Sequence, residues 1–175
     1  MPKIAIVRLI NRNDQRADRG QRRAAGIYGT VITAAIIDTA GGHISTTQLV
    51  VSVFVTLLVY WAAEQYAVLL GEHTQGGHLP SWRQASASLA ATWPMVAASY
   101  IPLLALVLAR LAGATDSGAA WAGLIVALLM LLYHGWSAGS AAGLRGKSLL
   151  AATLMAAGLG VVMILLKELV LLHLH

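Results

Sequence analysis

The sequence predicts an all-α fold: a polytopic transmembrane helical bundle of about five spans, preceded by a basic tail. Composition is the first reason. Hydrophobic residues make up 58% of the 175 residues and charged residues 11%, against about 25% charged in ordinary globular domains. Mean hydropathy is +0.71. A chain with so little polar surface cannot coat a water-soluble particle, so we expect lipid to be part of its solvent.

Five long apolar stretches are the second reason. Each can cross about 30 Å of hydrocarbon, which takes roughly 20 residues. They cover residues 24–42, 47–70, 87–110, 119–140 and 149–173. We expect all five to be helices, because an open strand edge finds no hydrogen-bonding partner in lipid. The first stretch is the weakest, since it contains Asp38 and ends at Gly41 and Gly42.

Residues 1–23 form the basic tail, and residues 24–175 form the bundle. Seven of the twelve Lys and Arg residues lie in the tail. Four arginines recur at a spacing that places them on one face of a helix. These are Arg12, Arg16, Arg19 and Arg23. We expect this face to contact anionic lipid headgroups, the alternative being a tail that only directs insertion. Nucleic acid is not an expected partner, because no aromatic residues are interleaved with the charges.

The loop charges indicate how the chain is threaded. With five spans and a cytoplasmic amino end, ten basic residues lie inside and only Arg110 lies outside. If residues 24–42 failed to cross, the count would be eight inside and three outside. The positive-inside rule therefore favours five spans, with the amino end inside and the carboxyl end outside. We expect the membrane to be a bacterial inner (plasma) membrane.

The second stretch carries a polar residue at every fourth position, which defines a ridge along one side of a helix. Its members are Ser52, Thr56, Tyr60 and Glu64. The threading places Glu64 and His134 of the fourth stretch at a similar depth near the inner leaflet. A carboxylate and a histidine that meet in a membrane are typical of a proton relay. Interhelical hydrogen bonding is the alternative role of the same ridge.

Charges near the outer ends of the first and last stretches suggest a second pair. Asp38 lies late in the first, and Lys167 and Glu168 lie late in the last. Because neighbouring helical residues point about 100° apart, at most one of Lys167 and Glu168 faces Asp38. We expect an outer-leaflet ion pair between Asp38 and Lys167.

The last three stretches carry signals for bending and close packing. Pro94 and Pro102 predict a kink in the third. Two sets of small residues, spaced four apart, allow close approach between helices and favour packing faces within the chain over a dimer seam. They are Gly135, Gly139 and Gly143 on the fourth, and Ala152, Ala156 and Gly160 on the fifth.

No catalytic, metal or cofactor site is predicted. Ser137 lies in a G-x-S-x-G string, but a nucleophile elbow needs a strand, a turn and a helix, and this string lies in an apolar helix. Glu72, His73 and His78 could contact a cation, yet no third strong ligand is fixed beside them. His173 and His175 lie at the chain end, and cysteine is absent.

Three segments are distinctive: Tyr28-Gly29-Thr30, Val59 to Ala67 with Glu64-Gln65 near its centre, and Gly158-Leu159-Gly160-Val161-Val162 leading to Leu166-Lys167. They resemble small multi-span integral membrane proteins of actinobacteria that are uncharacterised in function. Glu64-Gln65 stands where that pattern has a histidine. The resemblance implies a helical membrane protein, and it carries over no activity.

These observations favour a structural or accessory membrane subunit. The first alternative is a proton, ion or small-solute conductor that uses Glu64, His134, Asp38 and Lys167. The second is an intramembrane enzyme or cofactor binder. The expected partners are the bilayer and either a second copy of the chain or a larger membrane complex.

Overall fold

The computed structural model describes the backbone of residues 2–76 and 82–173. Side chains are described from residue 19 to residue 162, except at 69, 72–82, 84, 85, 87, 157 and 159, and again at 165. Within these residues the protein is all-α and has no strand, which confirms the predicted fold class. The helices are α1 (Pro2–Ala40), α2 (Thr46–Gly76), α3 (Trp82–Thr92), α4 (Pro94–Ala97), α5 (Tyr100–Leu111), α6 (Asp116–Ala141) and α7 (Lys147–His173).

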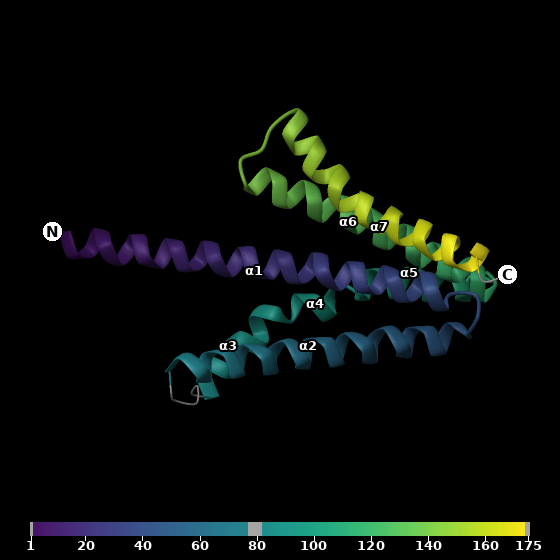
Figure 1. Ribbon diagram of the computed structural model, residues 1–175, viewed down its shortest axis with the longest axis horizontal. Helices are drawn as coiled ribbons and strands as arrows, with labels where there is room; N and C mark the ends of the chain where they lie inside the picture. The colour runs from purple at the N-terminus through teal and green to yellow at the C-terminus, as the bar shows by residue number, and fades with distance from the viewer. Residues whose placement is uncertain (1, 77–81, 174–175) are drawn as a thin grey trace.

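The helical passes alternate in direction along the long axis of the protein (Figure 1). The start of α1, the end of α2 and the α6–α7 turn lie toward one end. The α1–α2 turn, the α5–α6 turn and the end of α7 lie toward the other. Three described segments are long and apolar enough to cross a membrane: Thr46–Val68, Ser88–Leu111 and Asp116–Ala141. The described apolar part of α7, Lys147–Val162, is shorter.

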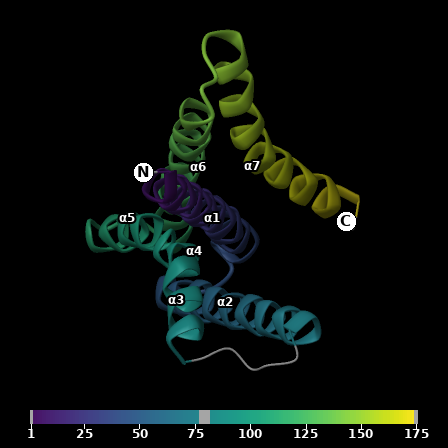
Figure 2. The same ribbon diagram turned by 90° about the vertical axis from the view of Figure 1, so that its left-hand side faces the viewer.

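Helix α1 stands at the centre of the bundle, with the other helices arranged around it (Figure 2). Ile37 is 1% exposed, and Thr30 and Thr33 are fully buried. Both threonine hydroxyls donate to backbone carbonyl oxygens one turn earlier, at 2.8 and 2.7 Å. A helix surrounded by other helices rather than by lipid tolerates such small and polar residues. This position accounts for the weak hydropathy of residues 24–42.

The same helix also contains the basic tail. Backbone hydrogen bonding runs without a break from Pro2 to Ala40, so no turn separates residues 2–23 from the segment that follows. At 1.5 Å per residue, its 39 residues extend about 58 Å, nearly twice the roughly 30 Å of a hydrocarbon core. The first half projects beyond the bundle in Figure 1.

The predicted kink in the third stretch is confirmed. The segment is divided into α3, α4 and α5, with one break at Trp93 before Pro94 and another at Ala98–Ser99 before Pro102. Proline has no N–H to continue the helical ladder, so each break precedes a proline. At the second break the Val96 carbonyl oxygen accepts hydrogen bonds from both the N–H and the hydroxyl of Ser99, at 3.1 and 2.8 Å.

The predicted close packing of the fourth stretch within the chain is confirmed for two of its three glycines, and α7 is the neighbour that they contact. A Cβ at Gly135 would lie 2.8 Å from the Cβ of Ala156, and one at Gly139 would lie 2.7 Å from Leu149. Gly143 is different, because α6 ends at Ala141 and Gly143 lies in the following turn with φ +78°. Its inclusion in the packing face was wrong: its positive φ serves the turn.

Candidate functional site

The polar ridge of α2 lies along the outside of the bundle. Ser52 and Thr56 are half-buried, Tyr60 is 48% exposed, and Glu64 is exposed. Leu57, on another side of the same helix, is fully buried in the hydrophobic core. Helix α2 therefore turns its apolar side inward and leaves much of its polar side uncovered.

Glu64 and Tyr60 line a pocket of about 420 Å³ between α2 and α1, here named the α1–α2 pocket. The other residues that line it are Gln21, Ala24, Ala25, Tyr28, Ala63 and Met95. No basic side chain is among them. The residues that line the pocket with Glu64 therefore carry one amide and two phenol hydroxyls, and none of them is basic.

His134 of α6 lines a second pocket, of about 540 Å³, here named the His134 pocket. Arg22 and Arg23 of α1 and Trp93 also line it. The imidazole lies against α1, since a Cβ at Gly26 would be 3.5 Å from its Cε1. Its Nε2 is buried and makes no hydrogen bond within the part of the chain that the structure describes.

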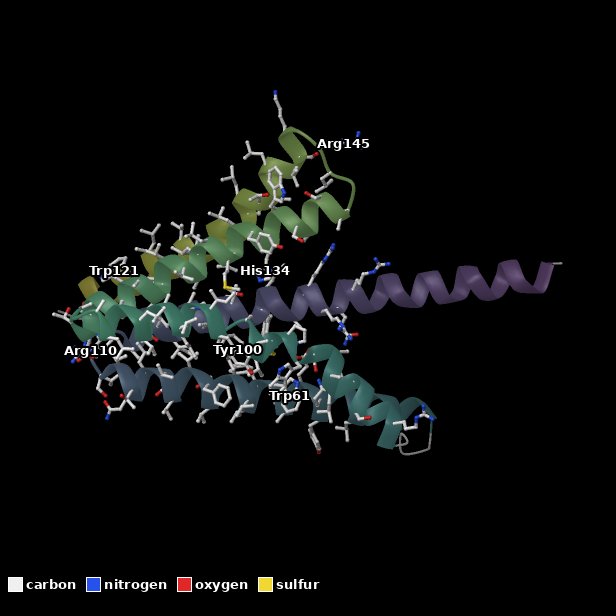
Figure 3. The ribbon with its side chains drawn as sticks, turned by 180° about the vertical axis from the view of Figure 1, so that it is seen from behind. Trp61, Tyr100, Arg110, Trp121, His134 and Arg145 are labelled. Atoms are coloured by element: carbon white, nitrogen blue, oxygen red, sulfur yellow. The ribbon has the colours of Figure 1, made fainter. Side chains whose placement is uncertain are left out.

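Helix α1 separates these two pockets. Arg22 and Gly26 line the His134 pocket, whereas Ala24 and Tyr28 line the α1–α2 pocket. Residues two apart on a helix point about 200° from each other, so the two pairs occupy opposite faces of α1. Figure 3 shows the same separation, with His134 and Trp61 of α2 on opposite sides of α1. The structure thus does not bring the ridge to His134, although the sequence predicted that they meet.

The sequence prediction missed a buried hydrogen bond between α2 and α3. The Nε2 amide of Gln65 donates to the Thr92 hydroxyl oxygen, and both residues are buried, at 5% and 1% exposed. A signal for it was present. Gln65 continues the four-residue spacing of the buried Leu49, Val53 and Leu57. A polar residue on an apolar stripe faces the core and needs a partner there.

A second missed contact joins three helices at the opposite end. The Asp116 carboxylate at the start of α6 accepts hydrogen bonds from the N–H and hydroxyl of Thr46, at 3.0 and 2.6 Å. The same oxygen lies 3.3 Å from Nε of Arg110. Thr46 begins α2 and Arg110 lies in the last turn of α5, so one carboxylate links α2, α5 and α6. Thr115 completes this end by capping α6, accepting from the Gly118 N–H at 3.1 Å.

The predicted outer ion pair falls only partly within the described residues. Asp38 is half-buried in the last turn of α1. The side chains of Lys167 and Glu168 lie outside the described residues, and the pair remains a prediction.

The basic face of α1 borders a third pocket. Arg19 and Arg23 are exposed and line a space of about 830 Å³ between α1 and the end of α6. Arg22, also exposed, lines the His134 pocket instead. The side chains of Arg12 and Arg16 lie outside the described residues. Residues 19–28 of α1 thus contribute to this pocket, to the His134 pocket and to the α1–α2 pocket.

The remaining motifs lie only partly within the described residues. Ser137 lies inside α6, with no strand or turn beside it, which is not the setting of a nucleophile elbow. Among the described residues, no three His, Cys, Asp or Glu side chains are grouped so as to hold a metal ion. The side chains of Glu72, His73, His78, His173 and His175 lie outside the described residues.

No family model matches the chain, and no curated protein or solved structure matches it either. The resemblance to actinobacterial membrane proteins therefore stays a prediction.

Proposed function

We propose that the chain is a structural or accessory subunit of a bacterial inner membrane. It crosses the membrane five times, with its amino end in the cytoplasm and its carboxyl end outside. The observation that carries the subunit role is the uncovered polar ridge of α2. The alternating helical passes and the distribution of charge support the threading.

The charges divide between the two ends of the bundle. Arg19, Arg22 and Arg23 belong to the half of α1 that lies toward the α6–α7 turn, and Arg145 lies in that turn (Figure 3). Arg110 lies at the opposite end from Arg145 (Figure 3), and it is paired with Asp116. Lysine and arginine are in excess on the cytoplasmic side of membrane proteins, which favours the Arg145 end as the inner one.

Two alanines allow a matched test of this threading. Ala112 and Ala142 both follow the last residue of a helix, at α5 and α6, with nearly the same backbone angles, and both are exposed. Because the chain contains no cysteine, Ala112→Cys and Ala142→Cys each introduce a single thiol. In spheroplasts, a membrane-impermeant maleimide is expected to label the Ala112→Cys variant. The Ala142→Cys variant should be labelled only after permeabilisation. The reverse pattern, or equal labelling of both before permeabilisation, contradicts the threading.

The subunit role is supported by how little of α2 the fold covers. In the candidate span of α2, Thr46–Val68, 17% of the most apolar stretch is buried. The corresponding share is 39% in both Ser88–Leu111 and Asp116–Ala141. A carboxylate such as Glu64 is costly against lipid, so a partner that covers it stabilises the assembly. Hydroxyl groups both donate and accept hydrogen bonds, which makes the ridge self-complementary. A second copy related by a two-fold axis along the membrane normal brings the same hydroxyls to the same depth, and is the first expected partner.

Assembly can be measured on protein extracted in mild detergent and placed in nanodiscs. We expect mass photometry to give a particle with more than one copy of the chain. The double variant Tyr60→Leu/Glu64→Leu should shift the population toward single copies. The matched control is Tyr100→Leu on α5, which removes a tyrosine of similar exposure, 46%, and should leave the assembly unchanged. A wild-type protein that is a single copy in nanodiscs, and that co-purifies with no other subunit from its native membrane, contradicts the proposal.

A further inference from the structure

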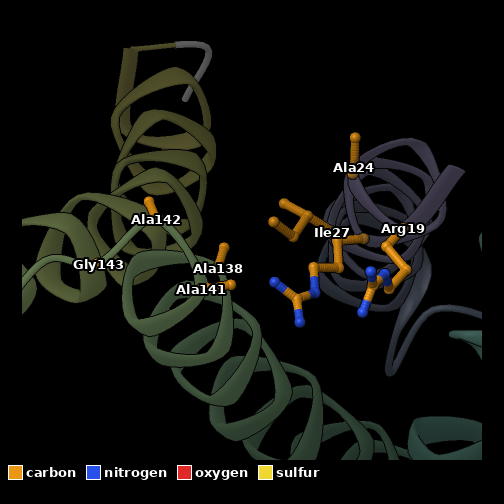
Figure 4. Close-up of a pocket in the computed structure, with 9 residues that line it drawn as sticks. Arg19, Ala24, Ile27, Ala138, Ala141, Ala142 and Gly143 are labelled. Carbon is orange, nitrogen blue, oxygen red and sulfur yellow. The ribbon is translucent and has the colours of Figure 1, made fainter. Parts of the chain in front are cut away.

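The space between α1 and the end of α6 has the form of a wedge. Figure 4 shows Arg19 and Ile27 of α1 on one side and, on the other, Ala138 and Ala141 of α6 with Ala142 just after it. Its volume is about 830 Å³, within the roughly 300–1,000 Å³ that small-molecule sites occupy. Gly20, Arg23, Ala24 and Gly143 complete its lining.

Helix α6 forms an apolar wall that cannot fill this space. The lining residues of that helix and its turn are alanines and a glycine, with no side chain longer than a methyl group. The other side of the same helix end is held by α7, because Gly139 is buried against Leu149. The end of α6 therefore follows α7 and leans away from α1, as Figure 1 shows.

Helix α1 forms the opposite wall, and its character changes along its length. Arg19, Arg23 and Ile27 are spaced four residues apart, so they lie on one face of the helix. The two guanidinium groups are exposed, whereas Ile27 is half-buried about 6 Å further into the bundle from Arg23. The wedge thus has a cationic end and an apolar end, in the order in which a lipid at a bilayer surface presents its phosphate and its acyl chain.

We infer that the wedge binds one anionic phospholipid. Arg19 and Arg23 hold its phosphate by charge-assisted hydrogen bonds, and an acyl chain lies along Ile27 and Ala138. The inference rests on the proposed threading for the leaflet, since a cytoplasmic amino end makes this a lipid of the inner leaflet. It differs from a general attraction of the basic tail to a negative surface, because it requires both the pair of arginines and the space between the helices.

Native mass spectrometry of the protein with defined lipids tests this directly. The probes are phosphatidylglycerol and, as the neutral comparison, phosphatidylcholine of the same acyl chains. Wild-type protein is expected to retain one phosphatidylglycerol in preference to phosphatidylcholine. The double variant Arg19→Gln/Arg23→Gln should lower the affinity for that lipid by about tenfold or more. A soluble headgroup, glycerol phosphate, should not displace the lipid, because it lacks the chain that occupies the apolar end.

Two further variants separate the wedge from its alternatives. Ala138→Leu fills the apolar wall without changing the charge, and it should weaken binding of phosphatidylglycerol as well. Arg22→Gln/Arg145→Gln removes the same charge from the same end of the protein but outside the wedge lining, and it should leave this binding unchanged. Thermal unfolding in detergent checks that each variant is folded.

The inference is overturned if the two double variants lose affinity equally, which indicates surface attraction only, or if Ala138→Leu retains full binding. Displacement by glycerol phosphate also overturns it, by assigning the arginines to a free phosphate. These outcomes are independent of the proposed threading. Lipid binding in detergent does not depend on which side of a membrane the amino end occupies, and maleimide labelling reports the side alone.

Discussion

Replacing Gly29 by alanine is expected to destabilise the bundle by about 3 kcal/mol, at the upper end of the cost of overpacking a core. Gly29 lies where α1 meets the short helix α4. A Cβ at this position would overlap the carbonyl oxygen of Met95 and lie 2.7 Å from its carbonyl carbon. Both are backbone atoms, so no side chain can rotate away, and α1 must move apart from α4. The free energy of unfolding, measured by titration with SDS in mixed micelles, is the quantity to compare.

Gly158→Ala is the matched control for this substitution. Gly158 also lies inside a helix, α7, but a Cβ there meets nothing within 4 Å. Alanine favours a helix over glycine by up to about 1 kcal/mol, so this variant should be neutral or slightly more stable. If the two variants unfold alike, α1 and α4 do not approach each other as closely as described.

Periodicity and composition predicted most of the helices, because both are local properties. Apolar runs of sufficient length give helices in lipid wherever they occur, and the all-α fold follows from them. The kink before Pro94 and Pro102 was equally predictable, since the missing N–H is a property of each proline alone. The spacing of Gly135 and Gly139 was sufficient to predict a close contact of α6, and α7 provides it.

Which helix packs against which face could not be predicted from periodicity and composition. The order and direction of the spans predict the depth of a residue in the membrane. They do not predict toward which neighbouring helix its side chain points. Glu64 and His134 were therefore assigned a similar depth, while the central position of α1 places them in separate pockets. The weak hydropathy of residues 24–42 was a sign of that central position, and it was interpreted only as a sign of a doubtful span.

The division between the basic tail and the first span was drawn from charge, and one helix runs across it. The sequence treated residues 1–23 as a separate tail, because their charge differs from that of the span. Charge does not break a helix, and no proline lies between residues 3 and 40. One continuous helix is the result, and it carries Arg19, Arg23 and Ile27 into the same wedge.

The buried bond between Gln65 and Thr92 predicts an asymmetric pair of variants. The Thr92 hydroxyl accepts from Gln65 and itself donates to the Ser88 carbonyl oxygen at 3.1 Å. Thr92→Val removes the acceptor and leaves the Gln65 amide buried without it, which should cost about 1–3 kcal/mol of unfolding free energy. Gln65→Leu leaves the hydroxyl bonded to Ser88, so its cost should be below about 1 kcal/mol.

A double-mutant cycle in the same SDS titration isolates this bond. When residue 65 is leucine, Thr92→Val leaves no buried amide without a hydrogen-bond partner. The double variant should therefore be close in stability to Gln65→Leu alone. The coupling energy is then most of the cost of the single Thr92→Val change. Additive costs, with no coupling, would mean that Gln65 finds another partner and that this bond does not hold α3 against α2. The expected coupling depends on burial of both groups, because in water the stranded amide would simply be hydrated.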